Sequence, residues 1–327
     1  MGMAQLGNRL YTGESSFDFV GRRKLWFLIA AALVLVSAVL LWKPGLTYGI
    51  EFEGGAEFRV SGTTNQDAAR EAVAAVVPDT VPTVTTAGDA VRVQTETLTT
   101  AQLDDLKGEL AQKLGVDPAN VTSSSIGPSW GADVTNKAIT GLVVFLVIVS
   151  IVMAVYFRAW TMAAASLVAL FHDLVITAGV YALVGFEVTP ASVIGFLTIL
   201  GYSLYDTVVV FDKVRENTEE AFVRRDRTFG AAANHAINQT VVRSVNTTVV
   251  ALLPVAAILF IGDLLLGAGT LRDISLALFV GMLVGAYSSI FVATPLLVVL
   301  RGREAKVKEL DADVRAGVRP DEPVAAE

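Results

Sequence analysis

Residues 191–217 read ASVIGFLTILGYSLYDTVVVFDKVREN, and this stretch decides how the rest of the chain is interpreted. Its first part is almost entirely apolar over about twenty residues, the length that a helix needs to cross a bilayer. One carboxylate, Asp206, lies inside that run, where an ionisable group is costly unless neighbouring helices shelter it. The helix then leaves the apolar region through Asp212, Lys213 and Arg215. An acid at this depth predicts a proton or ion site inside a helical bundle.

The composition indicates a polytopic membrane protein. Of 327 residues, 53% are hydrophobic and 17% are charged, and the mean hydropathy is +0.58, values that do not fit a soluble domain. The chain contains no cysteine, which excludes disulfides and thiolate chemistry. Its two histidines, His172 and His235, are too few for a histidine-rich metal site. The net charge of −7 argues against a nucleic-acid partner.

Six apolar runs predict six membrane spans and set the domain boundaries. Residues 1–24 form a cytoplasmic N-terminal segment, and residues 25–42 form the first span. A cleaved signal peptide is the alternative for this span, but Trp42-Lys43-Pro44 offers no small-residue cleavage site. Residues 43–137 form the region that looks like a water-soluble domain. The other five spans are expected at residues 138–157, 160–184, 190–211, 247–262 and 274–300, and the charged tail at residues 301–327 is expected to be disordered.

The polar region between the first two spans alternates strand and helix patterns. Strands are expected at residues 56–60, 81–86, 90–95 and 121–126, and helices at residues 65–77 and 99–114. Ala87-Gly88-Asp89 is a hairpin turn signal, and Gly115 is a helix stop. The resulting order β-α-β-β-α-β is the split βαβ arrangement of ferredoxin-like α+β domains.

Lysine and arginine in the short connecting segments predict the orientation. They gather before the first span, at Arg158 after the second, between residues 213 and 227, and after the sixth span. The links on the other side, residues 185–189 and 262–273, contain only Arg272. We therefore expect both termini in the cytoplasm and the α+β domain on the outer side of the membrane.

Asp206 is the leading candidate for chemistry. On a helix, Gly195, Ile199, Tyr202 and Asp206 fall close to one face, which can turn towards the interior of a bundle. A structural acid that bonds to a hydroxyl group of a neighbouring helix is the alternative interpretation. The side chains expected to support Asp206 are Tyr202, Ser203, Tyr205, Thr207 and, at the mouth of the fifth span, Asn246.

A second acid and a cation complete the expected set. Asp173 lies about halfway along the third span, next to His172. A neutral histidine lowers the cost of burying the carboxylate, and the same pair can pass a proton on, so a structural and a functional role both remain open. Arg243, at the inner mouth of the fifth span, is the expected partner of ionised Asp206. A headgroup anchor is the alternative for Arg243.

Several kinds of enzyme do not fit the sequence. No G-x-x-x-x-G-K-[ST] motif is present, so nucleotide binding is not expected. An intramembrane aspartyl protease needs Gly-x-Gly-Asp and Pro-Ala-Leu motifs, but the chain offers only Ile261-Gly262-Asp263, at an outer membrane edge. We expect no catalytic residue, no metal and no cofactor, and a role in transport.

Several motifs together resemble the SecD/SecF family of protein-export proteins, and within it the SecF subunits, over about residues 20–300. The matching stretches are GIEFEGG at 49–55, IGPS at 126–129, FHD at 171–173, GYSLYDTVVVFD through REN at 201–217, and Asn238-Gln239-Thr240 with Arg243-Ser244 and Thr247-Thr248. Glu51, Gly54, Gly55, Gly127 and Pro128 belong to these family motifs. Glu51 departs from the aspartate that the family usually carries, but it keeps the charge.

The resemblance implies a polytopic α-helical membrane protein of six transmembrane helices, one half of an RND-like architecture, with a ferredoxin-like extracytoplasmic domain between the first two spans. It also implies an accessory subunit of the Sec translocase in the bacterial cytoplasmic membrane, which uses the proton motive force to promote preprotein translocation. In that role Asp206 carries the proton and Arg243 is its charge partner. The implied partners are SecD, the SecYEG channel and the preprotein, with YajC as a further candidate. Half of another RND-type exporter, for lipids or small molecules, is the alternative, and it would be expected to carry a larger outer domain.

Overall fold

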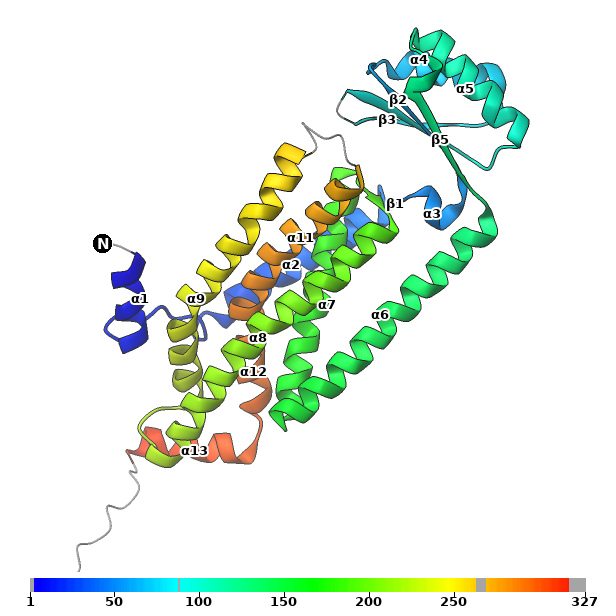
Figure 1. Ribbon diagram of the computed structural model, residues 1–327. Helices are drawn as coiled ribbons and strands as arrows, with labels where there is room; N and C mark the ends of the chain where they lie inside the picture. Colours follow the sequence, from blue (N-terminus) through cyan, green and yellow to red (C-terminus); the bar gives the residue numbers. More distant parts are fainter. Residues whose placement is uncertain (1–2, 88, 263–268, 318–327) are drawn as a thin grey trace, which may run out of the picture.

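The computed structural model describes residues 3–87, 89–262 and 269–317. A bundle of long helices carries a small α+β domain at one end (Figure 1). Six helices in the described part are long and apolar enough to cross a membrane: Arg23–Trp42, Pro128–Phe157, Trp160–Val184, Pro190–Arg224, Phe229–Ile261 and Leu271–Arg301. The predicted fold, six spans with an α+β region between the first and the second, is confirmed.

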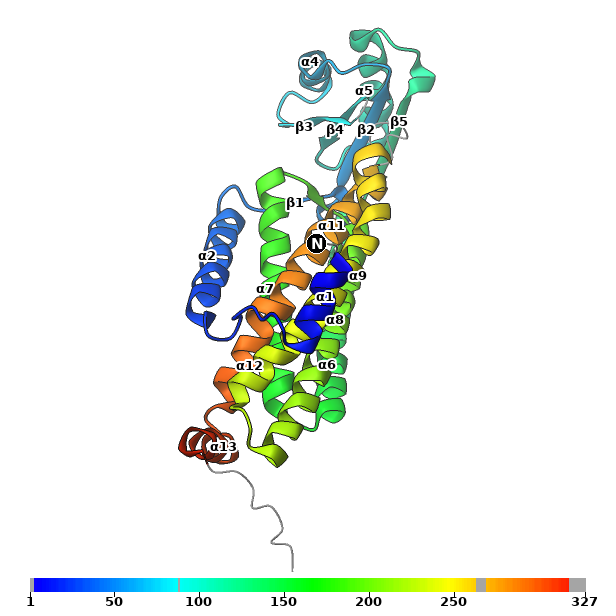
Figure 2. The same cartoon turned by 90° about the vertical axis from the view of Figure 1, so that its left-hand side faces the viewer.

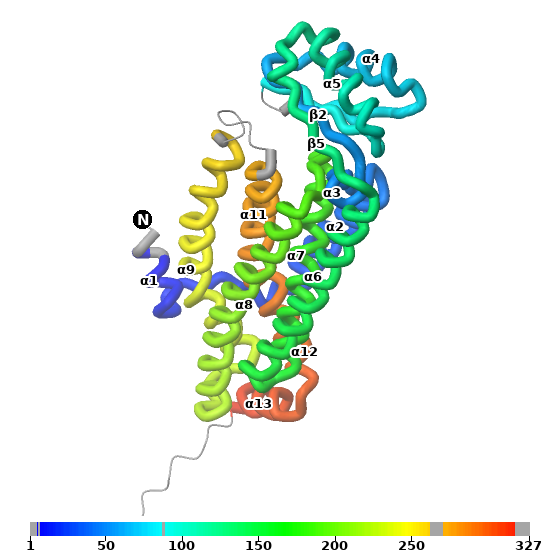
Figure 3. The backbone as a smooth tube through the Cα atoms, turned by 45° about the vertical axis from the view of Figure 1, so that its right-hand side comes forward, coloured from blue at the N-terminus to red at the C-terminus, as the bar shows by residue number. Residues whose placement is uncertain are grey.

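The bundle has a buried centre and a lipid-facing edge. Its spans are formed by α2 (Arg23–Trp42), α6 (Pro128–Phe157), α7 (Trp160–Val184), α8 (Pro190–Arg224), α9 (Phe229–Ala257) with the π-helical turn η2 (Ile258–Gly262), and α11 (Gly269–Ser288) joined through the π-helical turn η3 (Ser289–Ala293) to α12 (Thr294–Arg301). Helices α7, α8 and α11 pack at the centre, whereas α2 lies against α7 at one edge (Figure 2). Helix α6 runs along another edge and leads up to the α+β domain (Figure 3).

The α+β domain is the ferredoxin-like unit that the sequence predicts. Its elements are β2 (Gly55–Ser61), α4 (Gln66–Val76), β3 (Thr83–Ala87), β4 (Ala90–Thr95), α5 (Thr100–Leu114), η1 (Pro118–Asn120) and β5 (Val121–Ile126). The strand order is β3-β4-β2-β5, with every neighbouring pair antiparallel, as the split βαβ arrangement requires. Phe58 and Val60 alternate with half-buried residues along β2 and pack on Leu106 and Leu110 of α5. The predicted turn at residues 87–89 includes position 88, which lies outside the described residues.

The segment between the fourth and fifth predicted spans, residues 212–246, is helical except at residues 225–228. Helix α8 continues to Arg224, and α9 begins at Phe229 after the N-cap residue Thr228. Small buried residues, among them Ala221 and Ala232, allow the two helices to pack closely beyond the apolar run. Asn217 on α8 also donates a hydrogen bond to Gln239 on α9 at 2.9 Å.

Two segments near the ends of the chain form helices that their polar composition does not indicate. Helix α1 (Met3–Thr12) lies against α9 (Figure 2), and Asn238 accepts a hydrogen bond from the backbone nitrogen of Phe17 at 2.8 Å. The prediction that the tail is disordered from residue 301 is wrong over residues 305–316, which form α13 (Ala305–Ala316). Val307 and Leu310 are buried against the bundle, and Asp311 accepts a hydrogen bond from the backbone of Phe229 at 2.9 Å. Residues 318–327 lie outside the described part.

Candidate functional site

Asp206 lies where three membrane spans meet. Its side chain is 8% exposed, and its Oδ1 accepts a hydrogen bond from Ser244 of α9 at 2.6 Å. Its other oxygen, Oδ2, is buried and has no hydrogen-bond partner among the described residues. Thr207, the next residue, exchanges a hydrogen bond of 2.9 Å with Ser289 on η3 of the last span. A carboxylate with one bonded and one free oxygen at this depth can take up a proton.

Asp173 forms a second buried cluster with His172. Asp173 is 1% exposed, and its Oδ2 accepts hydrogen bonds from Ser203 of α8 at 2.6 Å and from Ser288 of α11 at 2.8 Å. His172 Nδ1 lies 3.0 Å from Asp173 Oδ1, while His172 Nε2 is buried without a partner in the described part of the chain. The sequence-predicted pair is therefore in contact, and hydroxyl groups from two other helices compensate the buried carboxylate.

Two consecutive serines connect the clusters. Ser288 ends α11 and donates to Asp173, whereas Ser289 begins the π-helical turn η3 and bonds to Thr207 beside Asp206. Single π-helical turns inside α-helices are frequent at functional sites, because they change the direction of neighbouring side chains. The two acids consequently belong to one polar layer that crosses the centre of the bundle.

Glycines bring α11 close enough to α8 for these contacts. A Cβ atom at Gly281 would lie 2.3 Å from Ile199, and one at Gly285 would lie 2.9 Å from Ser203. On the facing helix, a Cβ atom at Gly195 would lie 2.9 Å from Ala277. Small residues spaced by four positions are typical of close packing between membrane helices. Because these glycines have no side chain, α8 and α11 approach closely, and Ser203 lies next to Gly285 of α11 while it bonds to Asp173.

The direct pair expected between Arg243 and Asp206 is not formed. Among the described residues, Arg243 makes no ion pair with Asp206, and its Nη2 instead donates to the hydroxyl oxygen of Tyr205 at 3.3 Å. Residue 244, not residue 243, faces Asp206, since consecutive residues of a helix point about 100° apart. Arg243 therefore lies on the outward side of α8 and α9, next to Tyr205, which is 55% exposed.

The predicted supporting residues fall into two groups. Ser203 and Thr207 are buried towards α11 and η3. Tyr205 and Asn246 are exposed, and Tyr202 is half-buried. One part of the set therefore belongs to the polar layer, and the other part lies on the surface near Arg243.

The family-motif residues form the joint between the domain and the bundle. The short strands β1 (Thr47–Tyr48) and β6 (Glu187–Val188) pair in parallel next to helix α3 (Ile50–Glu53). Gly54 has a φ of 82°, and a Cβ atom there would lie 3.0 Å from Pro128, at the start of α6. A Cβ atom at Gly55 would lie 2.4 Å from the carbonyl oxygen of Thr95 on β4. The two glycines therefore allow a close approach of three backbone segments. Gly127 is the N-cap residue of α6, and Glu51 has a buried Oε2 without a partner in the described part of the chain.

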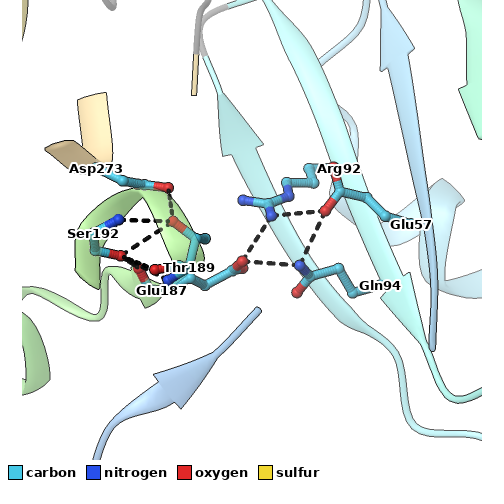
Figure 4. A network of polar contacts seen from close by, with 7 residues as sticks. All are labelled: Glu57, Arg92, Gln94, Glu187, Thr189, Ser192 and Asp273. Atoms are coloured by element: carbon cyan, nitrogen blue, oxygen red, sulfur yellow. Dashed lines mark hydrogen bonds and ion pairs between the residues drawn. The ribbon is translucent and has the colours of Figure 1, made fainter. Parts of the chain in front are cut away.

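A polar network links the sheet to the bundle (Figure 4). Arg92 on β4 lies 2.7 Å from both Glu57 on β2 and Glu187 on β6. Gln94 donates to Glu187 at 2.9 Å and to Glu57 at 3.2 Å. Burial raises the pKa of Glu187, against the opposing effect of Arg92. Burial lowers the pKa of Arg92, but Glu57 and Glu187 outweigh this effect and raise the pKa above its ordinary value.

The network continues to the first turn of α8. Thr189 and Ser192 form a capping box there, in which the Thr189 backbone donates to Ser192 Oγ at 2.6 Å. Thr189 Oγ1 also lies 3.5 Å from Asp273 at the start of the last span, and Figure 4 shows these groups side by side with Glu187. The helix that carries Asp206 thus begins at the contact between the two parts of the molecule.

Sequence reasoning missed most of this network. Glu187 had a detectable signal, because it is the one acid in the five-residue link between two spans. Arg92, Gln94 and Glu57 had none, since polar residues on one face of a small sheet are ordinarily solvated. In the described part of the chain, no group of three or more His, Cys, Asp or Glu side chains is arranged to hold a metal ion.

Comparisons with known proteins agree with this architecture. The family description "Protein export membrane protein SecD/SecF, C-terminal" matches residues 107–303. Protein translocase subunit SecF of Streptomyces coelicolor is 48% identical over 316 residues, which cover 96% of this chain and 84% of that protein. SecF of Mycobacterium tuberculosis is 44% identical, over 92% of this chain and 71% of that one.

A solved structure shares the fold. The crystal structure of SecDF from Thermus thermophilus, described as a translocon-associated membrane protein, superposes with a TM-score of 0.78 at 31% identity and covers 88% of this chain. The match spans 39% of that SecDF chain, so the present chain corresponds to about two fifths of it. On the family match and on the identity to curated relatives, this chain belongs to the SecF protein translocase subunits of the SecD/SecF family.

Proposed function

We propose that this SecF subunit couples proton movement to preprotein export, with Asp206 as the group that takes up and releases the proton. The observation that carries this proposal is the environment of Asp206: 8% exposed, bonded on one oxygen to Ser244, and without a partner on the other among the described residues. An acid that served only as a structural hydrogen-bond acceptor would be expected to have both oxygens bonded.

Arg243 acts in this proposal through a change of contact. In the present conformation it bonds to Tyr205, one residue before Asp206. Ionised Asp206 attracts the guanidinium group, and protonated Asp206 releases it to Tyr205. Such a pair of alternative contacts gives the helices α8 and α9 two states that the protonation of one carboxylate selects.

The surface around Arg243 is proposed to be covered by a SecD-type half. Tyr205, Arg243 and Asn246 are exposed on the same side of two membrane helices, where lipid would solvate a guanidinium group poorly. The solved SecDF relative is more than twice the length that this chain matches, as the 39% coverage shows. A second half on this side supplies polar groups at the level of Asp206.

The proposed orientation places the α+β domain outside the cytoplasm. Both termini lie in the cytoplasm, so that the α+β domain meets the preprotein on the outer side of the bacterial cytoplasmic membrane. The SecYEG channel and YajC are the further proposed partners. The proton reaches Asp206 along the polar layer, from His172 and Asp173 through Ser288 and Ser289.

The test compares two acids of the same helix. Asp206→Asn keeps the shape of the side chain but cannot ionise, and it should abolish proton-dependent stimulation of preprotein export into membrane vesicles. Asp212→Asn is the matched control: Asp212 lies 2.7 Å from the Tyr156 hydroxyl, at the end of the apolar run, and its loss should leave stimulation intact. Normal stimulation by the Asp206 variant, at wild-type protein levels, would refute the proton role.

Arg243 needs a separate comparison. Arg243→Met should lose stimulation as Asp206→Asn does, whereas Arg243→Lys should retain part of it because it keeps the charge. Equal stimulation by the wild type, Arg243→Met and Arg243→Lys would mean that Arg243 is only a headgroup anchor.

A further inference from the structure

A cavity of about 850 Å³ opens at the end of the bundle that lies away from the α+β domain. Its wall is formed by residues from the corner of α6 and α7, from the last turns of α8, and from the junction of α12 with α13. Figure 1 shows where these elements lie. The charged residues of its lining are Arg158, Arg215, Glu219, Arg301 and Lys306. Four side chains of this wall are cationic and one is acidic.

Part of the positive charge in the cavity is uncompensated. Arg215 pairs with Glu219 at 3.1 Å, and Arg301 pairs with Glu304 at 3.3 Å. Arg158 and Lys306 form no ion pair with any residue that the structure describes. Among the described residues, the cavity therefore presents two cations without an acid partner and two more that are each paired with one acid, a charge pattern suited to an anion.

The backbone of Arg158 has a conformation that residues with a side chain seldom adopt. Arg158 is the C-cap residue of α6 and has a φ of 49°, in the left-handed region. Glycine or asparagine ordinarily occupies this position, because a Cβ atom is disfavoured there. An arginine held in this conformation directs a cation to the corner between two spans, which a glycine could not do.

The cavity lies at the level of the lipid headgroups. Helix α6 exposes the apolar side chains Val147, Ile151 and Val155 along its length. Tyr156 follows, and Trp160, which is 73% exposed, begins α7. Tyrosine and tryptophan concentrate at the boundary between hydrocarbon and water, so the mouth of the cavity faces the phosphate layer.

The walls also suit the first part of an acyl chain. Phe157, Met162 and Phe222 give the cavity an apolar side next to its cations. A ligand that combines a phosphate with a hydrocarbon chain satisfies both parts, whereas free phosphate uses only the cations. Basic pockets between membrane helices on the cytoplasmic side bind anionic lipid headgroups in this way.

We propose that this cavity binds the phosphate headgroup of an anionic phospholipid, with Arg158 and Lys306 as the principal phosphate ligands and the acyl chains against α6. Bound lipid would hold the α6–α7 corner against α8 and α13. The inference does not depend on proton coupling, because Asp206 and Arg243 lie outside the cavity lining.

The test uses the purified full chain in neutral detergent. Phosphatidylglycerol should raise the melting temperature more than phosphatidylcholine does, since a ligand stabilises the state that binds it. Native mass spectrometry should show retained phosphatidylglycerol. The double variant Arg158→Asn/Lys306→Gln should lose the selective shift and retain at least tenfold less phosphatidylglycerol. Asparagine is chosen at position 158 because it tolerates the left-handed backbone.

The matched control removes two positive charges from nearby residues outside the cavity. Arg303→Gln/Lys308→Gln alters two exposed cations of the same region that do not line the cavity, and it should keep the lipid-dependent shift. An equal loss in both double variants would overturn the site in favour of general surface charge. A shift of the same size with inorganic phosphate alone would overturn the assignment to a lipid. Melting in phosphatidylcholine shows that each variant is folded.

Discussion

The packing of α11 on α8 gives the sharpest quantitative prediction, which concerns Gly281→Ala. The added Cβ atom would lie 2.3 Å from Cδ1 and Cγ2 of Ile199, a buried residue. Carbon atoms in contact are separated by about 3.5–4.0 Å, so the two helices must separate by more than about 1 Å or Ile199 must change its rotamer. Either movement displaces the contact between Ser203 and Asp173, two residues of the polar layer.

The magnitude follows from two opposing terms. Overpacking of a close contact costs about 1–3 kcal/mol, and replacement of glycine by alanine in a helix returns about 1 kcal/mol. We expect a net loss of up to about 2 kcal/mol in the free energy of unfolding, which corresponds to a melting temperature up to about 6 °C lower. Relative to a glycine-to-alanine change without a clash, the loss is about 1–3 kcal/mol. Gly141→Ala on α6 is the matched control, since a Cβ atom at Gly141 meets nothing within 4 Å. The control should melt at the wild-type temperature or slightly above.

Thermal melting of the purified chain in detergent measures both variants, and Ile199→Ala supplies the decisive comparison. If the clash is real, the double variant Gly281→Ala/Ile199→Ala should be more stable than the sum of the two single effects predicts, because the second substitution removes the clashing atoms. Strictly additive effects, or a Gly281→Ala protein that melts with the Gly141→Ala control, would refute the reasoning.

Two further predictions concern polar contacts. Ser203→Ala removes a 2.6 Å hydrogen bond to Asp173, and it should cost about 1.5–3 kcal/mol, as for other bonds to charged groups; thermal melting checks this, and an unchanged protein would contradict it. Burial raises the pKa of Glu187 in the folded protein. The protonated carboxyl group therefore favours the folded state fully below the ordinary pKa of about 4.3, and this stabilisation is lost as the pH rises through the higher pKa of the folded state. Glu187→Gln should therefore melt like the wild type near pH 4 and at a higher temperature at pH 8; a lower temperature at pH 8 would mean that Arg92 outweighs burial.

The elements that could be predicted are those whose signal is local. A carboxylate in an apolar run is conspicuous, so Asp206 and Asp173 were identifiable without any knowledge of packing. Their actual partners, Ser244, Ser203 and Ser288, carry hydroxyl groups, which membrane spans tolerate at many positions. The α+β domain was predictable because its strand and helix periods differ clearly.

The elements that could not be predicted depend on rotation between helices. Whether Arg243 or Ser244 faces Asp206 is decided by how α9 is turned about its axis, and a shift of one residue changes the direction by about 100°. The prediction of a disordered tail failed for a different reason. Val307, Leu310 and Val314 follow a helical spacing, but the surrounding charge and the later prolines outweighed this signal.

The length of α8 has a mechanical consequence. Its 35 residues run without interruption from Pro190 to Arg224, a rod of about 52 Å at 1.5 Å per residue. Its neighbours are softer: the last span bends through η3, and α9 contains Pro254. A force on the α+β domain that reaches Glu187 through Arg92 would therefore displace α8 along its axis as one rigid helix. The adjoining helices would instead bend.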